Sequence, residues 1–129
     1  MLIKSFAKVS PEKKFISLRY FNPAGSHSSG KLGDWPSNYP GNLFPVIQEY
    51  IIGKRKELKV FGNDYQTIDG SGVRDYIHIT DLAQGHMAAL SYFEKMKDSN
   101  YEVFNLGGGV GYSVLEVIAA FEKYLGRKL

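Results

Sequence analysis

Segments with a strand pattern and segments with a helix pattern follow one another along this chain, and that order limits its possible folds. The strand patterns, in which β-branched or aromatic residues recur with polar ones, lie at residues 14–20, 59–61, 75–79 and 101–106. The helix patterns lie at residues 42–52, at 80–93 or 81–93, and at 113–125. Because strands joined through helices form crossover units, the order predicts an α/β fold with a mostly parallel sheet.

Capping residues mark the ends of the expected helices. Asn42 is expected to cap the first helix, and Gly53 to end it. Ser113 and Glu116 have the spacing of a capping box, and Gly126 is expected to end the last helix. Thr80 or Asp81 is expected to cap the middle helix, with one apolar stripe formed by Leu82, His86, Leu90 and Phe93.

Two long irregular segments separate these elements. Residues 22–41 are rich in Ser and Gly, and residues 62–72 are rich in Gly, Asn and Asp, so both are expected to be loops. Loops of this length are uncommon in compact domains unless they bind something. The segment 22–41 is therefore expected to be functional or mobile.

Size and composition exclude several classes of protein. A chain of 129 residues is enough for one domain, and a formal charge of +3 with dispersed basic residues is too small for a nucleic-acid-binding stripe. No apolar run approaches the ~18 residues of a membrane span, and the start has no long apolar h-region. The chain has no cysteine, which fits a reducing compartment. We expect a cytoplasmic protein without a membrane or nucleic-acid partner.

A cluster of glycines at residues 107–111 lies between a predicted strand and a predicted helix. Backbone amides at such a place can hold a phosphate. The spacing departs from Gly-x-Gly-x-x-Gly, however, because Tyr112 occupies the last position. A tight turn is the favoured interpretation, and a phosphate site is the alternative.

Other candidate motifs do not form a catalytic set. The Tyr-x-x-x-Lys pairs Tyr50/Lys54 and Tyr124/Lys128 both straddle glycines that end helices, so their spacing is attributed to chance. No metal site is expected, because the three histidines lack partners at metal-ligand spacing. The carboxylates are scattered, so no acid/base pair is expected among Asp64, Asp69, Asp75 and Asp81.

Two residues beside the second loop suit an anionic, ring-bearing ligand. Arg74 follows the loop and precedes a strand, where its guanidinium can contact a phosphate. Phe61 precedes the loop and can present a flat face to a base. The alternatives are an ion pair of Arg74 with Asp75 or Asp69, and a core contact for Phe61.

Several stretches together resemble a known family. They are residues 18–25 (LRYFNPAG), 42–43 (NL), 60–65 (VFGNDY), 69–78 (DGSGVRDYIH), 81–83 (DLA) and 105–107 (NLG). This order is similar to that of the UDP-glucose 4-epimerases, which are extended short-chain dehydrogenases/reductases. The resemblance covers nearly the whole chain and implies part of a doubly wound, Rossmann-like parallel sheet with a smaller substrate-binding region.

The resemblance also implies that residues 1–129 are a single fragment. Family members are about two to three times this length, as a cofactor half plus a substrate half requires. Their dinucleotide fingerprint, catalytic Ser/Thr and Tyr-x-x-x-Lys lie upstream of the segment that matches Met1. The expectation is a UDP-sugar-binding portion with the C-terminal strands and helices of the NAD-binding fold, and no catalytic residue of its own.

Positions carried over from the family imply roles for individual residues. Tyr20 and Phe21 are expected to border the nicotinamide of NAD, and Asn22 the sugar. The family often has Asn-Asn-Leu where this chain has Gly41-Asn42-Leu43, which leaves one side-chain contact open. On the nucleotide side, the resemblance implies that Asn42 and Leu43 contact the diphosphate or the uridine, and that Arg74 contacts the pyrophosphate. It also implies that Lys59, Val60 and Phe61 flank uracil, with the Phe61 ring stacked on it.

The implied reaction interconverts UDP-glucose and UDP-galactose. NAD removes a hydride from the sugar C4, the 4-keto intermediate turns, and the hydride returns to the other face. Two alternatives remain: another NAD-dependent nucleotide-sugar epimerase or dehydratase, or a non-catalytic UDP-binding fragment. The resemblance leaves open whether the parent enzyme is a homodimer.

Overall fold

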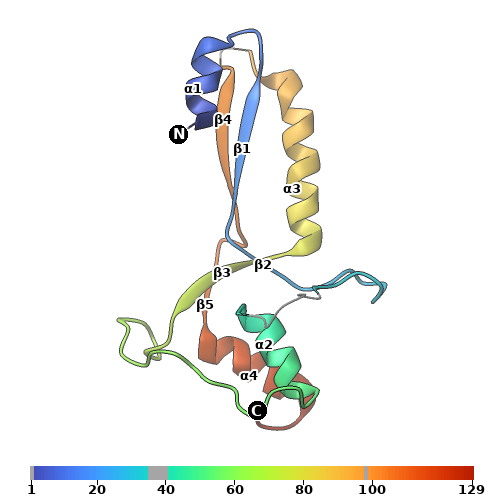
Figure 1. The fold of residues 1–129 in the computed structure, drawn as a ribbon, viewed down its shortest axis with the longest axis vertical. Helices are drawn as coiled ribbons and strands as arrows, with labels where there is room; N and C mark the ends of the chain where they lie inside the picture. The colour runs from blue at the N-terminus through green and yellow to red at the C-terminus, as the bar shows by residue number, and fades with distance from the viewer. Residues whose placement is uncertain (1, 35–40, 98) are drawn as a thin grey trace.

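The computed structural model describes residues 2–34, 41–97 and 99–129, so part of the first predicted loop lies outside the described residues. Helices and strands alternate as the sequence predicts, with further short elements between them (Figure 1). The elements are α1 (Leu2–Val9), β1 (Phe15–Tyr20), β2 (Asn22–Ala24), α2 (Leu43–Ile51), β3 (Val73–His78), α3 (Ile79–Tyr92), the 3-10 helix η1 (Phe93–Lys95), β4 (Tyr101–Leu106), β5 (Gly111–Ser113) and α4 (Val114–Leu125).

The strands form two small sheets. In the first, β1 pairs with β4 in parallel, from Phe15 opposite Tyr101 to Tyr20 opposite Leu106. In the second, β3 lies between β2, which is parallel to it, and β5, which is antiparallel. The predicted α/β class with parallel strands is confirmed.

The two sheets belong to two ends of an elongated molecule. At one end, α1 and α3 flank the β1–β4 pair, and at the other end α2 and α4 lie beside each other (Figure 1). The chain crosses between the ends directly after β1 and again after β4, where β2, β3 and β5 lie. This crossing brings the two long loops to the same end as α2 and α4.

Three short elements differ from the prediction. Helix α1 was not expected, β2 occupies the start of the segment expected to be a loop, and β5 begins at the last glycine of the glycine cluster. Residues 59–61 were expected to form a strand, and this is wrong: within the described residues they pair with no other strand. A short strand pattern without a neighbouring edge gains no ladder hydrogen bonds.

The N-cap of helix α3 lies two or three residues earlier in the chain than expected. Its N-cap is His78, whose Nδ1 accepts a hydrogen bond from the Thr80 backbone N–H at 3.2 Å, so the expected caps Thr80 and Asp81 are wrong. The predicted apolar stripe is partly right, because Leu82 is buried whereas Leu90 is 59% exposed. His86 and Phe93 of the predicted stripe are half-buried, and Ala89 is half-buried in place of Leu90.

The caps of α2 and α4 differ in a way that the sequence explains. Asn42 is the N-cap of α2, but its side chain makes no capping bond. An N-cap side chain bonds to the amide of the second or third helical residue, and Pro45 in the third position has no N–H. The capping box of Ser113 and Glu116 is confirmed in α4, and Gly126 ends the helix with φ of 67°.

The core at the α2–α4 end is aromatic. The ring of Phe44 meets Tyr76 with a centroid distance of 5.3 Å and Phe121 with a distance of 5.7 Å, both edge to face. Ile47 of α2 is fully buried beside them. These contacts fix β3 against α2 and α4.

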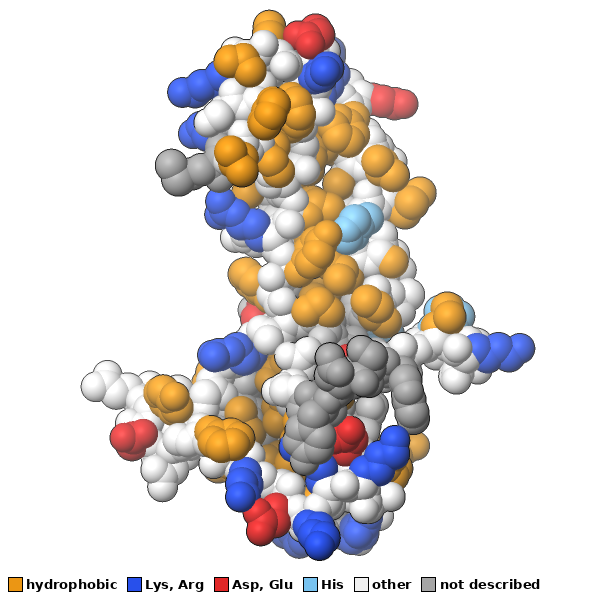
Figure 2. Space-filling model, viewed as in Figure 1, with side chains coloured by type: hydrophobic (Ala, Val, Ile, Leu, Met, Phe, Trp, Pro, Cys, Tyr) orange, Lys and Arg blue, Asp and Glu red, His pale blue; other side chains and the backbone are white. Residues whose placement is uncertain are grey.

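The chain leaves much apolar surface uncovered, also at its other end. The accessible surface of the chain is 9899 Å², whereas a compact monomer of 14.5 kDa exposes about 6,900 Å². Leu2, Phe6 and Val9 of α1 are 60–77% exposed, and hydrophobic side chains gather over this end of the molecule (Figure 2). No helix among the described residues is long and apolar enough to cross a membrane.

Candidate functional site

A hollow of about 1540 Å³ lies where β2, β3, the start of α2 and the two long loops meet. Parallel β2 and β3 present their carboxyl ends here, the usual place for a ligand in an α/β fold. The predicted site residues that line it are Phe21, Asn22, Asn42, Leu43, Phe61 and Arg74.

Arg74 reaches the hollow from the start of β3. Its guanidinium NH1 donates to the Val73 carbonyl at 2.9 Å and remains exposed to solvent. The alternative of an ion pair is wrong, because among the described residues the ion pairs do not include Arg74. Asp69 and Asp75 accept hydrogen bonds from other groups. Within the described residues, Arg74 thus faces the hollow outside any ion pair.

Phe61 lines the same hollow from the segment before the second loop. Its side chain is 83% exposed, so the alternative of a core contact is wrong. A large exposed ring is costly to leave in water and is favourable once another flat group covers it. Phe61 and Arg74 together offer one face for a ring and one charge for an anion.

Tyr76 lines the hollow two residues after Arg74. Burial raises the pKa of its phenol above the ordinary value of 10.0, and the positive charge of Arg74 acts in the opposite direction. The phenol is therefore neutral at physiological pH. No phenolate at Tyr76 offsets the positive charge of Arg74 on this side of the hollow.

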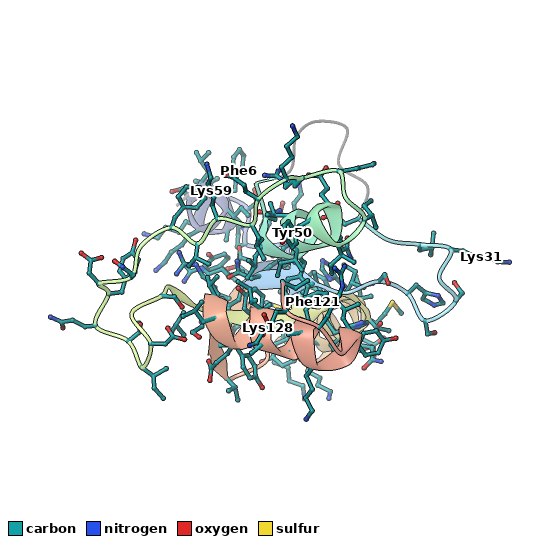
Figure 3. All side chains as sticks on the ribbon, turned by 90° about the horizontal axis from the view of Figure 1, so that it is seen from below. Phe6, Lys31, Tyr50, Lys59, Phe121 and Lys128 are labelled. Atoms are coloured by element: carbon teal, nitrogen blue, oxygen red, sulfur yellow. The ribbon has the colours of Figure 1, made fainter. Side chains whose placement is uncertain are left out.

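Three predicted site residues lie outside the lining. Lys59 pairs with Glu57 at 2.9 Å, and both side chains are about two-thirds exposed. Val60 is 37% exposed beside it. Lys59 lies along the edge of the segment that leads from α2 to the second loop, and Lys31 projects from the tip of the first loop (Figure 3).

Tyr20, the third of these residues, makes a defined contact with α3. Its hydroxyl lies 2.9 Å from His86 Nε2, and His86 Nδ1 lies 2.8 Å from the Leu82 carbonyl oxygen. Because a carbonyl only accepts, Nδ1 carries a proton, and in the neutral ring Nε2 accepts from Tyr20. His86 thus has a structural role, because it joins Tyr20 of β1 to the backbone of α3.

The glycine cluster is used within the chain. The Gly108 and Gly109 amides donate to the two carboxylate oxygens of Asp75 at 2.6 and 2.9 Å. A Cβ at Gly107 would lie 2.6 Å from an Asp75 oxygen, and one at Gly108 would lie 2.6 Å from the Tyr76 carbonyl. The glycines permit this close approach, and the amides proposed for a phosphate bind a carboxylate instead.

Asp69 joins the second loop to the start of α4. One carboxylate oxygen accepts from the Ser71 amide at 2.9 Å and the Ser71 hydroxyl at 2.7 Å, and the other accepts from the Ser113 hydroxyl. The hydrogen bond from Ser113, followed by those from Ser71, holds the pKa of Asp69 below its ordinary value of 3.8. Both serines are almost completely buried.

Sequence reasoning missed Asp69 and Asp75 because their partners are distant in the sequence. The Asp69–Ser71 contact is an Asx-type turn, so the spacing Asp-x-Ser is the one local signal that could have indicated it. For Asp75, the contact with Gly108 spans 33 residues and leaves no local pattern.

The Tyr-x-x-x-Lys pairs do not form sites. Lys54 and Lys128 both lie beyond the last residues of their helices, as the helix-ending glycines predict. Tyr124 is 90% exposed, and Lys128 pairs with Glu122 at 2.7 Å. Within the described part of the chain, no group of three or more His, Asp or Glu residues could hold a metal ion.

Comparison with known proteins identifies relatives over nearly the whole chain. The model of the NAD dependent epimerase/dehydratase family matches residues 2–107. UDP-glucose 4-epimerase of Erwinia amylovora is 50% identical over 125 residues, which are 97% of this chain and 36% of that enzyme. The chain therefore spans little more than a third of the length of this relative.

Solved structures agree with the sequence comparison. UDP-glucose 4-epimerase from Bifidobacterium longum, in complex with NAD+ and UDP, is 46% identical with a TM-score of 0.89 over 98% of this chain and 37% of that chain. The enzyme from Stenotrophomonas maltophila, with NAD and formylated UDP-arabinopyranose, is 42% identical with a TM-score of 0.91 over 99% of this chain and 38% of that chain. The chain belongs to the NAD-dependent epimerase/dehydratase family, within which it is similar to the UDP-glucose 4-epimerases.

Proposed function

We propose that this chain is the nucleotide-binding portion of an NAD-dependent UDP-glucose 4-epimerase, an enzyme that interconverts UDP-glucose and UDP-galactose. The observation that supports it is the shared hollow, which Phe61 and Arg74 line together. In this arrangement Arg74 neutralises the diphosphate and Phe61 stacks on uracil. The binding energy of this UDP handle restrains the sugar at the reacting end.

The remaining lining residues extend the proposed contact along the ligand. Asn42 and Leu43 contact the diphosphate or the uridine from the start of α2, and Asn22 contacts the sugar from β2. Lys59 and Val60 lie outside the lining, so we propose for them at most a flanking role beside uracil.

NAD fits the other side of the proposed site. Tyr20 and Phe21 are 50% and 44% exposed at the end of β1, so part of each ring is open to border a nicotinamide. The cofactor, when bound, takes a hydride from the sugar C4 and returns it. The hydrogen bond to His86 fixes the direction of the Tyr20 hydroxyl, and this chain supplies no proposed catalytic base.

A calorimetric titration of the chain with UDP tests the proposal. Arg74→Ala is expected to weaken UDP binding by about 1.5–3 kcal/mol, the scale of a hydrogen bond to a charged group. Arg19→Ala is the matched control, because Arg19 is an exposed arginine on β1 outside the lining. Unchanged affinity for UDP in Arg74→Ala would rule out the assignment.

A non-catalytic UDP-binding fragment is the second candidate. It is favoured because the lysines of both Tyr-x-x-x-Lys pairs lie beyond the ends of their helices, so neither pair has the helical spacing that activates a tyrosine as a base. UDP binding without conversion of UDP-galactose to UDP-glucose supports this candidate. Turnover by the chain itself supports the complete activity.

A further inference from the structure

The carboxylate of Asp75 takes up two neighbouring amides of the glycine cluster. Gly108 N–H donates to Oδ1 at 2.6 Å and Gly109 N–H donates to Oδ2 at 2.9 Å. Hydrogen bonds to an ionised acceptor are about twice as strong as those between neutral groups. The contact joins β3 to the turn between β4 and β5, and the chain continues from this turn through β5 into α4.

Asp75 and Arg74 are neighbours on one strand and point to opposite sides of it. Arg74 and Tyr76 line the hollow, as do Gly72 and Val73 before them, and Asp75 does not. Successive side chains of a strand alternate between its two faces. The same short stretch of β3 therefore carries a cation toward the ligand and a carboxylate toward the glycine turn behind it.

We propose that Asp75 is a positioning residue of the nucleotide site. Its hydrogen bonds to Gly108 and Gly109 fix β3 against the glycine turn, and thereby hold Arg74 at the edge of the hollow. The inference rests on the proposed function, because it takes Arg74 to be the cation for the diphosphate. It extends that function to a residue that does not touch the ligand.

Asparagine is the most informative replacement for Asp75. Its single amide oxygen can accept from one glycine amide, whereas its NH₂ group would face the other N–H. Gly107 also approaches this side chain closely, since a Cβ built there would lie 2.6 Å from Oδ2. Asp75→Asn therefore removes one hydrogen bond and the charge with little change in shape.

The test is a double-mutant cycle on UDP affinity. Asp75→Asn is expected to raise the dissociation constant for UDP at least about tenfold, the scale of one hydrogen bond to a charged group. In the Arg74→Ala background the same replacement is expected to change it by less than about twofold, because the effect acts through Arg74. The control Glu94→Gln removes one exposed carboxylate from η1 and is expected to leave UDP affinity unchanged.

Two results would overturn the inference: unchanged UDP affinity in Asp75→Asn, or an equal loss in both backgrounds, which indicates a general structural effect. If Asp75→Asn unfolds, wild-type NMR spectra decide. UDP is then expected to shift the Gly108 and Gly109 amide resonances, and resonances that stay fixed refute the coupling.

If the wild-type chain does not bind UDP, the proposed function fails, and the role of Asp75 is tested by the NMR resonance of the Arg74 Nε–H group. That resonance is expected to move in Asp75→Asn but not in Glu94→Gln, and an unmoved resonance refutes the coupling.

Discussion

Single carboxylates determine how the loops of this chain are held. Asp69 ties the second loop to α4 through buried Ser71 and Ser113, and Asp75 ties β3 to the glycine turn. The capping box of α4 was predictable from the sequence, because Ser113 and Glu116 are three residues apart. The roles of Asp69 and Asp75 were not, because the contacts with Ser113 and Gly108 span 44 and 33 residues.

The lowered pKa of Asp69 predicts a pH dependence of stability. In the folded chain the pKa of Asp69 lies below its ordinary value of 3.8. As the pH falls, the Asp69 carboxylate of the unfolded chain therefore takes up a proton before that of the folded chain. The stabilisation is thus complete above the unfolded pKa and is lost as pH falls through the lower folded pKa. In Asp69→Asn, the free energy of unfolding measured with urea is expected to lose this part of its dependence on pH.

Asp64→Asn is the matched control for that measurement, because Asp64 is an exposed carboxylate in the same loop. The difference between wild type and Asp69→Asn isolates Asp69 from other groups, including Glu122, whose pKa is also lowered, chiefly by Lys128. Identical acid profiles for wild type and Asp69→Asn would contradict the proposed role of the network.

At the scale of the elements, the long periodic segments were predictable and the short ones were not. β1, β4 and the three long helices follow their sequence patterns closely. β2 and β5 have three residues each and exist because β3 offers them an edge on both sides. Residues 59–61 have a strand pattern of the same length but pair with no strand within the described residues. Short strands thus depend on tertiary contacts that local patterns do not contain.

The start of α4 gives a prediction at this scale. Ser113→Ala removes the N-cap acceptor for the Glu116 amide and also the hydroxyl that donates to Asp69. It is expected to lower the free energy of unfolding by about 2 kcal/mol, at the upper end of the range for N-cap losses. Glu116→Gln keeps the capping-box chemistry and is expected to change stability little. Equal effects of the two variants in urea unfolding would refute this.

At the scale of the whole molecule, the elongated shape leaves apolar surface uncovered. The excess over a compact monomer is about 3,000 Å², which exceeds the ~1,600 Å² of a standard protein interface. The α/β class was predictable because alternating strands and helices favour it. The hollow was only partly predictable, because the crossing of the chain between its two ends decides which loops meet.

The uncovered surface predicts that the chain self-associates. Sedimentation velocity is expected to show a sedimentation coefficient that rises with protein concentration, and Phe6→Glu on α1 is expected to reduce this rise. Tyr124→Glu on α4 is the control, since Tyr124 is 90% exposed at the other end of the molecule. A single monomeric species at all concentrations would contradict the prediction.

The central claim is that Phe61 and Arg74 hold two parts of one UDP molecule. The most direct measurement is a crystal structure of the chain with UDP bound. The account predicts that the uracil ring lies against Phe61, and that the Arg74 guanidinium donates to diphosphate oxygens at about 2.7–2.9 Å. A structure in which UDP lies outside the hollow, or contacts neither side chain, would contradict it.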